Sequence, residues 1–149
     1  MRDPGRSGCP INMAVEAFGD RWTLLVLRDV MFGNRRYFRE LFASSEEGIA
    51  SNILADRLKQ LVAAGLLTRA QVRPGQRAMY SLTEAAIELV PLLALLGLWG
   101  VRYRDTDPQL RARAQSLADG GPAVWAEFMD ELRELHLSQQ PTKAPVLTP

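Results

Sequence analysis

The sequence predicts a mainly α-helical chain with one small β-hairpin; two observations lead to this fold class, and a third excludes two other ways of stabilising the chain. Apolar residues recur at helical spacing in several separate stretches, and a Pro-Gly turn joins two short runs of extended character. Cys9 is the one cysteine among 149 residues. That count excludes an internal disulfide framework and a zinc site built from thiolates.

The first part of the chain is predicted to hold three helices before the most informative stretch. A short helix follows Pro10 and is interrupted near Gly19. The next helix begins after Asp20, whose side chain can cap free N–H groups, and it stops at Gly33. A third, short helix covers residues 35–44, with its apolar side chains on one face.

A fourth helix is predicted in the stretch GIASNILADRLKQLVAAGLL, beginning at Ala50 or Ser51 and ending at Gly65. Its leucines recur at spacings of four and three, which indicates a buried stripe. The opposite face is polar but mostly short-chained, unlike the Glu and Lys side chains of an ordinary solvated helix. Its residues are Ser51, Asn52, Ala55, Asp56, Lys59 and Ala63.

A hairpin and a long helix are predicted next. Two extended runs flank RPGQR, and Thr83 is placed to cap a helix that continues to Arg104, with a kink at Pro91. This helix is apolar nearly all round over residues 89–101. It must therefore be buried from several sides, in a core or against another subunit. The apolar run itself is too short to span a bilayer.

The last part of the chain is predicted to contain two shorter helices, one after Pro108 and one beginning at Pro122. The second carries an apolar stripe that ends at Leu135, and His136 beside it is expected to be solvated. We divide the chain into a domain over residues 9–104, a helical extension over 105–137 and a disordered tail over 138–149.

Charge and composition narrow the function classes. Up to Arg104 the chain has 14 Lys and Arg against 10 Asp and Glu, and beyond it 4 against 7, so a basic body precedes an acidic extension. One histidine leaves little material for a Ser-His-Asp triad or a catalytic metal. We therefore expect no enzyme, no cofactor and no metal. The N-terminus lacks the apolar core of a signal peptide, so a cytoplasmic location is expected.

A short helix, a turn, a second helix and a hairpin in direct succession form the winged helix-turn-helix arrangement. In such proteins the second helix enters the major groove and offers base edges its N-terminal side chains. Ser and Asn can hydrogen-bond bases at close range, and Ala can touch a thymine methyl group. Asp56 could accept from a cytosine amino group, or pair with Lys59 or a neighbouring Arg to orient it.

Affinity for DNA comes mainly from neutralised phosphates, so basic residues around the fourth helix are further candidates. Three arginines stand at the start of the short helix before the turn, and three polar or basic residues are expected near the hairpin tip. These residues are Arg35, Arg36, Arg39, Arg73, Gln76 and Arg77. A hairpin tip is often basic simply because it is exposed, and this alternative remains open for the last three.

Five stretches carry a specific resemblance: CP at Cys9, GDRWTLLVLRDVMFG, RRYFREL, the fourth-helix block, and YSLTEAA. Together they cover residues 9–104. With them the chain resembles HxlR-type regulators, a branch of the MarR-like winged-helix transcription factors of bacteria. The resemblance implies a homodimer joined through its terminal helices and a palindromic operator in double-stranded DNA. The expected interface residues are Met13, Leu92, Leu95, Leu96 and Trp99.

The same resemblance suggests how binding is regulated. Some members of the family sense electrophiles or oxidants through a cysteine near the N-terminus, and Cys9 stands at the matching place. We therefore expect a dimeric, sequence-specific DNA-binding repressor that responds to a small molecule, an electrophile or an oxidant, with no membrane partner. The alternative is a protein-interaction module built on a winged helix that no longer reads DNA.

Overall fold

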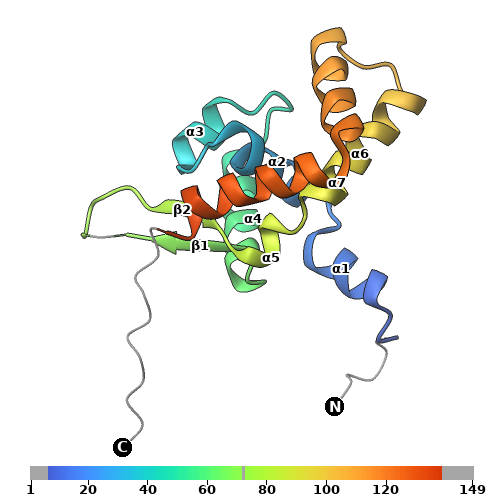
Figure 1. Cartoon of the computed structure of the whole chain (residues 1–149). Helices are drawn as coiled ribbons and strands as arrows, with labels where there is room; N and C mark the ends of the chain where they lie inside the picture. The colour runs from blue at the N-terminus through green and yellow to red at the C-terminus, as the bar shows by residue number, and fades with distance from the viewer. Residues whose placement is uncertain (1–6, 72, 139–149) are drawn as a thin grey trace, which may run out of the picture. The chain divides into compact units, whose positions relative to one another are not determined.

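The computed structural model describes residues 7–71 and 73–138, which form seven helices and one two-stranded antiparallel sheet (Figure 1). The chain divides into two compact units, Met1–Leu89 and Val90–Pro149. The first unit contains α1 (Pro10–Phe18), α2 (Arg21–Gly33), α3 (Phe38–Ala43), α4 (Ser51–Ala63), β1 (Leu67–Ala70), β2 (Met79–Leu82) and α5 (Glu84–Ile87). The second contains α6 (Val90–Tyr103) and α7 (Pro108–His136). The predicted fold class is confirmed.

Local signals set the ends of α2 and α4. The Asp20 carboxylate accepts hydrogen bonds from the backbone N–H groups of Trp22 and Thr23, at 2.9 and 3.3 Å. Asn34 ends α2 in the left-handed conformation, with φ of 49°. Gly65 takes a φ of 75° just after α4, a backbone conformation that glycine adopts without steric cost. These helix ends agree with the prediction to within two residues.

The core of the first unit lies where α2, α3 and α4 pack on one another and on the sheet. Leu54, Leu58 and Leu61 are at most 1% exposed, so the predicted stripe is the buried face of α4. The other buried apolar residues of this unit are Val26, Leu27, Val30, Met31, Leu41, Ile49, Leu66, Leu67, Leu82, Ala86 and Ile87. Burial of this face fixes which side of α4 remains available to solvent.

The hairpin pairs β1 with β2 from Leu67 opposite Leu82 to Ala70 opposite Met79. A third segment joins it, because Tyr37 forms a bridge with Met79 and the Tyr80 N–H donates to the Arg36 carbonyl oxygen at 2.8 Å. The prediction that the third helix starts at Arg35 is therefore wrong. Residues 35–37 precede the helix, Arg36 and Tyr37 pair with β2, and α3 begins at Phe38.

The predicted long helix after Thr83 is in fact two helices. Thr83 does cap the first, since its hydroxyl oxygen accepts from the Ala86 N–H at 3.3 Å. That helix, α5, ends at Ile87, and α6 begins at Val90. Pro91 explains the break, because proline lacks an N–H group and its ring clashes with the carbonyl four residues earlier. The predicted kink is therefore a full interruption.

The second unit contains the two predicted C-terminal helices as α7. The helix is interrupted at Gly121, where φ is 67° and ψ is −163°, and Pro122 begins the second half as predicted. The Trp125 Nε1–H donates to the Leu117 carbonyl oxygen across the break, at 2.8 Å. The expectation of a solvated His136 is wrong, since its side chain is fully buried. Most of the predicted disordered tail, residues 139–149, lies outside the described part of the chain.

Helix α6 has several large apolar side chains that are partly exposed within one chain. Only Val90 and Ala94 are buried on it. The expectation of burial in the chain's own core is therefore wrong, and burial against another subunit stays a prediction. By length and composition only, the described stretch Glu84–Tyr103, which comprises α5, the break and α6, is long and apolar enough to cross a membrane, with a mean hydropathy of 1.7 over an 18-residue window. This stretch is longer than the apolar run over residues 89–101, which by itself is too short to span a bilayer. One stretch of this kind is weak evidence for a membrane span.

Candidate nucleic-acid interface

The predicted reading face starts at the first residue of α4. Ser51 and Asn52 are exposed in its first turn, Lys59 is exposed two turns later, and Ala55 is half-buried between them. The N-cap residue of this helix is Ala50, and no side chain among residues 7–71 and 73–138 caps its first turn. The N–H groups of an uncapped first turn favour a phosphate oxygen, and contacts of this kind position helix-turn-helix proteins on a duplex.

Asp56 is engaged within the protein. Its Oδ2 atom accepts from Arg57 Nη1 at 2.6 Å and from Gln60 Nε2 at 2.9 Å. Arg57 in turn donates to Asp20 at the start of α2, at 3.2 Å. Asp56 was predicted either to accept from a cytosine or to pair with Lys59 or a neighbouring arginine. In the structure it pairs with Arg57. Lys59 has no ion pair with the described residues.

The hairpin tip presents three of the predicted residues together. Arg73, Gln76 and Arg77 are exposed, and the turn is closed by a hydrogen bond from the Gln76 N–H to the Arg73 carbonyl oxygen at 3.1 Å. Gly75 has a φ of 83°, which explains the glycine of the Pro-Gly turn. Within residues 7–71 and 73–138, neither arginine forms an ion pair, so both charges are available to a phosphate.

The three arginines before α4 do not act alike. Arg39 is exposed on α3. Arg36 is 8% exposed, and its guanidinium donates to the Tyr80 carbonyl oxygen at 3.1 Å and to the Ser81 hydroxyl. Burial lowers the pKa of Arg36 below its ordinary value. This arginine joins residues 35–37 to the hairpin, and its burial does not favour the predicted phosphate contact.

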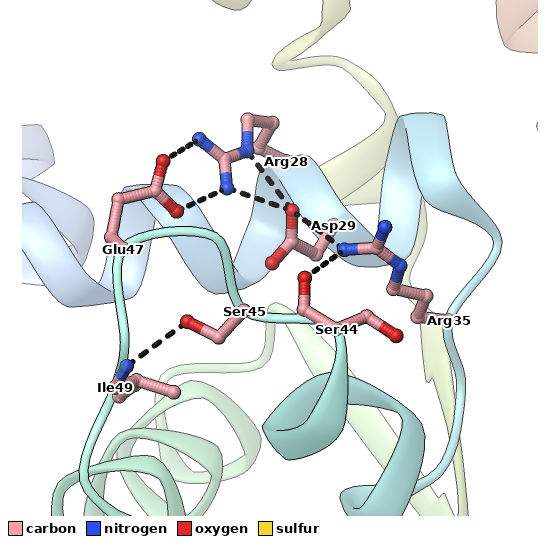
Figure 2. Close-up of polar contacts among 7 residues, drawn as sticks. All are labelled: Arg28, Asp29, Arg35, Ser44, Ser45, Glu47 and Ile49. Carbon is pink, nitrogen blue, oxygen red and sulfur yellow. Dashed lines mark hydrogen bonds and ion pairs between the residues drawn. The ribbon is translucent and has the colours of Figure 1, made fainter.

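Arg35 belongs to a polar cluster that sequence reasoning missed (Figure 2). The cluster consists of Arg28, Asp29, Arg35 and Glu47. Arg28 forms two hydrogen bonds with the Glu47 carboxylate, at 2.9 and 2.7 Å, and one from Nε to Asp29 at 3.0 Å. The hydrogen bonds from Arg28 hold the pKa of Glu47 below its usual range, whereas burial raises the pKa of Asp29. Arg28 and Glu47 are 19 residues apart, and no local spacing signals their contact.

The predicted sensor and interface residues are on the surface. Cys9 is exposed immediately before α1, and α1 buries none of its own residues. The exposed fraction is 44% for Met13 and 51% for both Leu95 and Trp99. Leu92 and Leu96 complete the predicted interface set and are also exposed. No group of three or more His, Cys, Asp or Glu side chains in the described part of the chain could hold a metal ion.

The comparisons with known proteins agree with this geometry. Residues 17–108 match the family model described as HxlR-like helix-turn-helix. The chain belongs to this family. The HTH-type transcriptional regulator Rv3095 of Mycobacterium tuberculosis is 36% identical over 109 residues, which is 71% of this chain and 67% of the relative. YdeP of Bacillus subtilis, also an HTH-type transcriptional regulator, is 30% identical over 110 residues, which is 70% of this chain and 81% of YdeP.

Solved structures lead to the same family of regulators. The candidate transcription factor PA1607 superposes with a TM-score of 0.62 and 33% identity over 69% of this chain and 70% of its own. The oxidised form of the redox regulator HypR superposes with a TM-score of 0.57 and a sequence identity of 25%. The match covers 66% of this chain and all of the HypR chain. This HxlR-like chain is therefore a helix-turn-helix transcriptional regulator by family, with redox-sensing relatives.

Proposed function

We propose that this HxlR-like protein is a cytoplasmic, dimeric repressor that binds a palindromic operator through α4 and the hairpin. One observation carries the proposal. In a single compact unit, an exposed first turn of short polar residues on α4 is combined with a hairpin tip whose Arg73 and Arg77 form no ion pair with any described residue. Short side chains permit close approach to base edges, and the arginines supply sequence-independent affinity.

Two roles follow for the residues of this face. Ser51, Asn52 and Ala55 specify the sequence, because they stand where a recognition helix meets the major groove. Arg39, Arg73 and Arg77 contact phosphates, together with Lys59 and the amide of Gln76. Asp56 acts indirectly, since its carboxylate is occupied by Arg57 and Gln60.

The dimer follows from apolar surface that one chain leaves uncovered. Leu92, Leu95, Leu96 and Trp99 are exposed on α6, and Met13 is exposed on α1. Large exposed apolar side chains such as these are typical of protein interfaces. Two-fold symmetry then presents two α4 helices to the two halves of a palindrome.

Regulation is assigned to Cys9 or to a small-molecule effector. Cys9 is exposed at the start of α1, where an oxidant or electrophile can reach it. With one cysteine in the sequence, a disulfide would join two subunits or a small thiol. The oxidised form of a structurally similar redox regulator supports this choice.

The test is a selection of bound genomic fragments, followed by affinity measurements on the best fragment and on a scrambled duplex. Asn52→Ala should lose discrimination between the two duplexes by about tenfold. Arg77→Ala should weaken both complexes equally and reduce the salt slope by about one. Arg113→Ala on α7, an exposed arginine without an ion pair in the described residues, is the matched control. Equal affinity of the wild type for both duplexes contradicts the proposal.

A protein-interaction module remains the second candidate, and the exposed acids Glu127, Glu131 and Glu134 on α7 favour it. A wild-type protein without any operator preference would support this alternative. Adding an oxidant to the same binding assay, with Cys9→Ser beside the wild type, tests the assignment of the sensor. A loss of operator binding that is equal in both proteins excludes Cys9.

A further inference from the structure

The loop between α3 and α4, residues 44–50, determines where the recognition helix begins. Within this loop the Gly48 N–H donates to the Ser45 carbonyl oxygen at 3.3 Å, and the Ile49 N–H donates to the Ser45 hydroxyl at 3.0 Å. Gly48 has a φ of 72°. These contacts shape the turn locally, and they do not connect it to the rest of the protein.

The connection to α2 is made by charged side chains. Arg28 holds both carboxylate oxygens of Glu47, and Asp29 holds Arg28 from the same helix. A two-bond pair of arginine and carboxylate fixes direction as well as distance. Glu47 is only four residues before Ser51, the first residue of α4, so this pair anchors the chain just ahead of the predicted reading face.

A second contact secures the beginning of the same loop. The Arg35 Nη1 atom donates to the Ser44 carbonyl oxygen at 3.0 Å and lies 3.6 Å from Asp29 Oδ1. Asp29 thus lies between two arginines, one of which contacts the first residue of the loop and the other its middle residue, as Figure 2 shows. The side chain of Asp29 is 12% exposed and that of Glu47 is 25%, so bulk water screens these pairs less than surface pairs.

We propose that Arg28, Asp29, Arg35 and Glu47 form a positioning cluster that sets the placement of the first turn of α4 and thereby the operator discrimination of the protein. This inference rests on the proposed function. The physical reason is that base readout requires donor–acceptor distances within a few tenths of an ångström, whereas attraction to phosphates tolerates a displaced helix. Loss of the cluster therefore reduces sequence discrimination more than it reduces general affinity for DNA.

The test compares two neighbouring glutamates of the same loop. Glu47→Gln keeps the shape of the side chain and removes its charge. Glu46→Gln makes the same chemical change at an exposed position that has no ion pair in the described chain. For each protein, affinity is measured on the selected operator and on the scrambled duplex at several salt concentrations, and thermal unfolding is measured in parallel.

We expect Glu47→Gln to lower the ratio of operator to scrambled affinity by about tenfold, with the scrambled affinity and the salt slope unchanged. Glu46→Gln should behave as the wild type. Arg28→Lys, which keeps the positive charge but loses the two-bond geometry, should lower the ratio less. If Glu47→Gln does not fold, the affinity ratio of Arg28→Lys tests the positioning role in its place.

Three outcomes separate the possible failures. An unchanged ratio in Glu47→Gln and Arg28→Lys overturns the positioning role while leaving the proposed function intact. An equal loss on both duplexes, with a lower melting temperature, makes the cluster merely structural and also overturns it. A wild type that does not discriminate between the duplexes refutes the proposed function, and this inference with it.

Discussion

Helices α4 and α6 are both rich in leucine, but a single chain covers them very differently. The leucine stripe of α4 is at most 1% exposed, whereas Leu95 and Trp99 on α6 are each 51% exposed. The stripe of α4 faces the core and its other side is polar. Helix α6 is apolar nearly all round, so any one neighbour covers only part of it. Apolar content therefore does not predict burial, whereas its arrangement around the helix does.

The largest effect should come from breaking the buried side of this comparison. Leu58→Ala removes a side chain that is 1% exposed, and we expect a loss of about 2–5 kcal/mol in the free energy of unfolding. Leu95→Ala should cost less than about 1 kcal/mol at protein concentrations where the chain is monomeric. Denaturant unfolding of both variants measures the contrast, and equal losses would contradict it.

The exposed apolar residues of α6 predict that a charge on this helix weakens dimerisation. Leu95→Glu places a charge on the apolar surface of α6 and should weaken dimerisation at least about tenfold, since a buried unpaired charge is costly. Analytical ultracentrifugation over a concentration series gives the dissociation constant. Val124→Glu, at a residue that is 41% exposed on α7, is the control and should leave assembly unchanged. A Leu95→Glu protein that sediments as the wild type does would place the interface elsewhere.

Two glycines of the second unit have different backbone conformations, and we expect opposite effects on stability when each is replaced by alanine. Gly121 combines a φ of 67° with a ψ of −163°, a conformation that is almost restricted to glycine. Gly121→Ala should therefore destabilise the protein by about 1–3 kcal/mol. Gly100 is helical, and outside its own helix backbone and chain neighbours no atom of the described residues lies within 4 Å of an added Cβ. Gly100→Ala should stabilise by up to about 1 kcal/mol, and thermal unfolding that ranks the two variants in the opposite order would contradict this account.

The smallest effect concerns the cap of α2 and its dependence on pH. Asp20→Ala should cost about 1 kcal/mol in the free energy of unfolding. Burial raises the pKa of Asp20, but hydrogen bonds from Thr23 and Arg57 outweigh it and hold the pKa below its ordinary value of 3.8. A carboxyl with a lowered pKa in the folded state stabilises above its unfolded pKa, and this contribution is lost as the pH falls through the folded pKa.

Asp20→Asn separates the cap from the charge, because asparagine is an equally good N-cap residue. The advantage of the wild type over this variant should shrink as the pH is lowered from about 5 to about 3. Denaturant unfolding at several pH values measures it. A difference that stays constant over this range would show that the charge of Asp20 contributes nothing.

The sequence alone determined the parts of this protein that depend on neighbouring residues. Caps such as Asp20 and Thr83, the leucine stripe of α4, the Pro-Gly turn and the helix beginning at Pro122 each follow from interactions over a few residues, and the structure has all of them. The same residues placed the predicted reading face, since the buried stripe leaves Ser51 and Asn52 on the opposite side.

Only the tertiary structure decided how charged and apolar groups far apart in the chain combine. Arg36 is buried against the hairpin, and Arg28 reaches Glu47 across 19 residues. Similarly, His136 is buried although its position near the tail predicted a solvated side chain, while several large apolar side chains of α6 are exposed. Each outcome depends on which elements pack together, and the long side chain of arginine can reach a phosphate or a distant carboxylate equally well. Local pattern therefore predicted which face of α4 points away from the core, and tertiary packing decided which arginines are held within the protein and which are exposed.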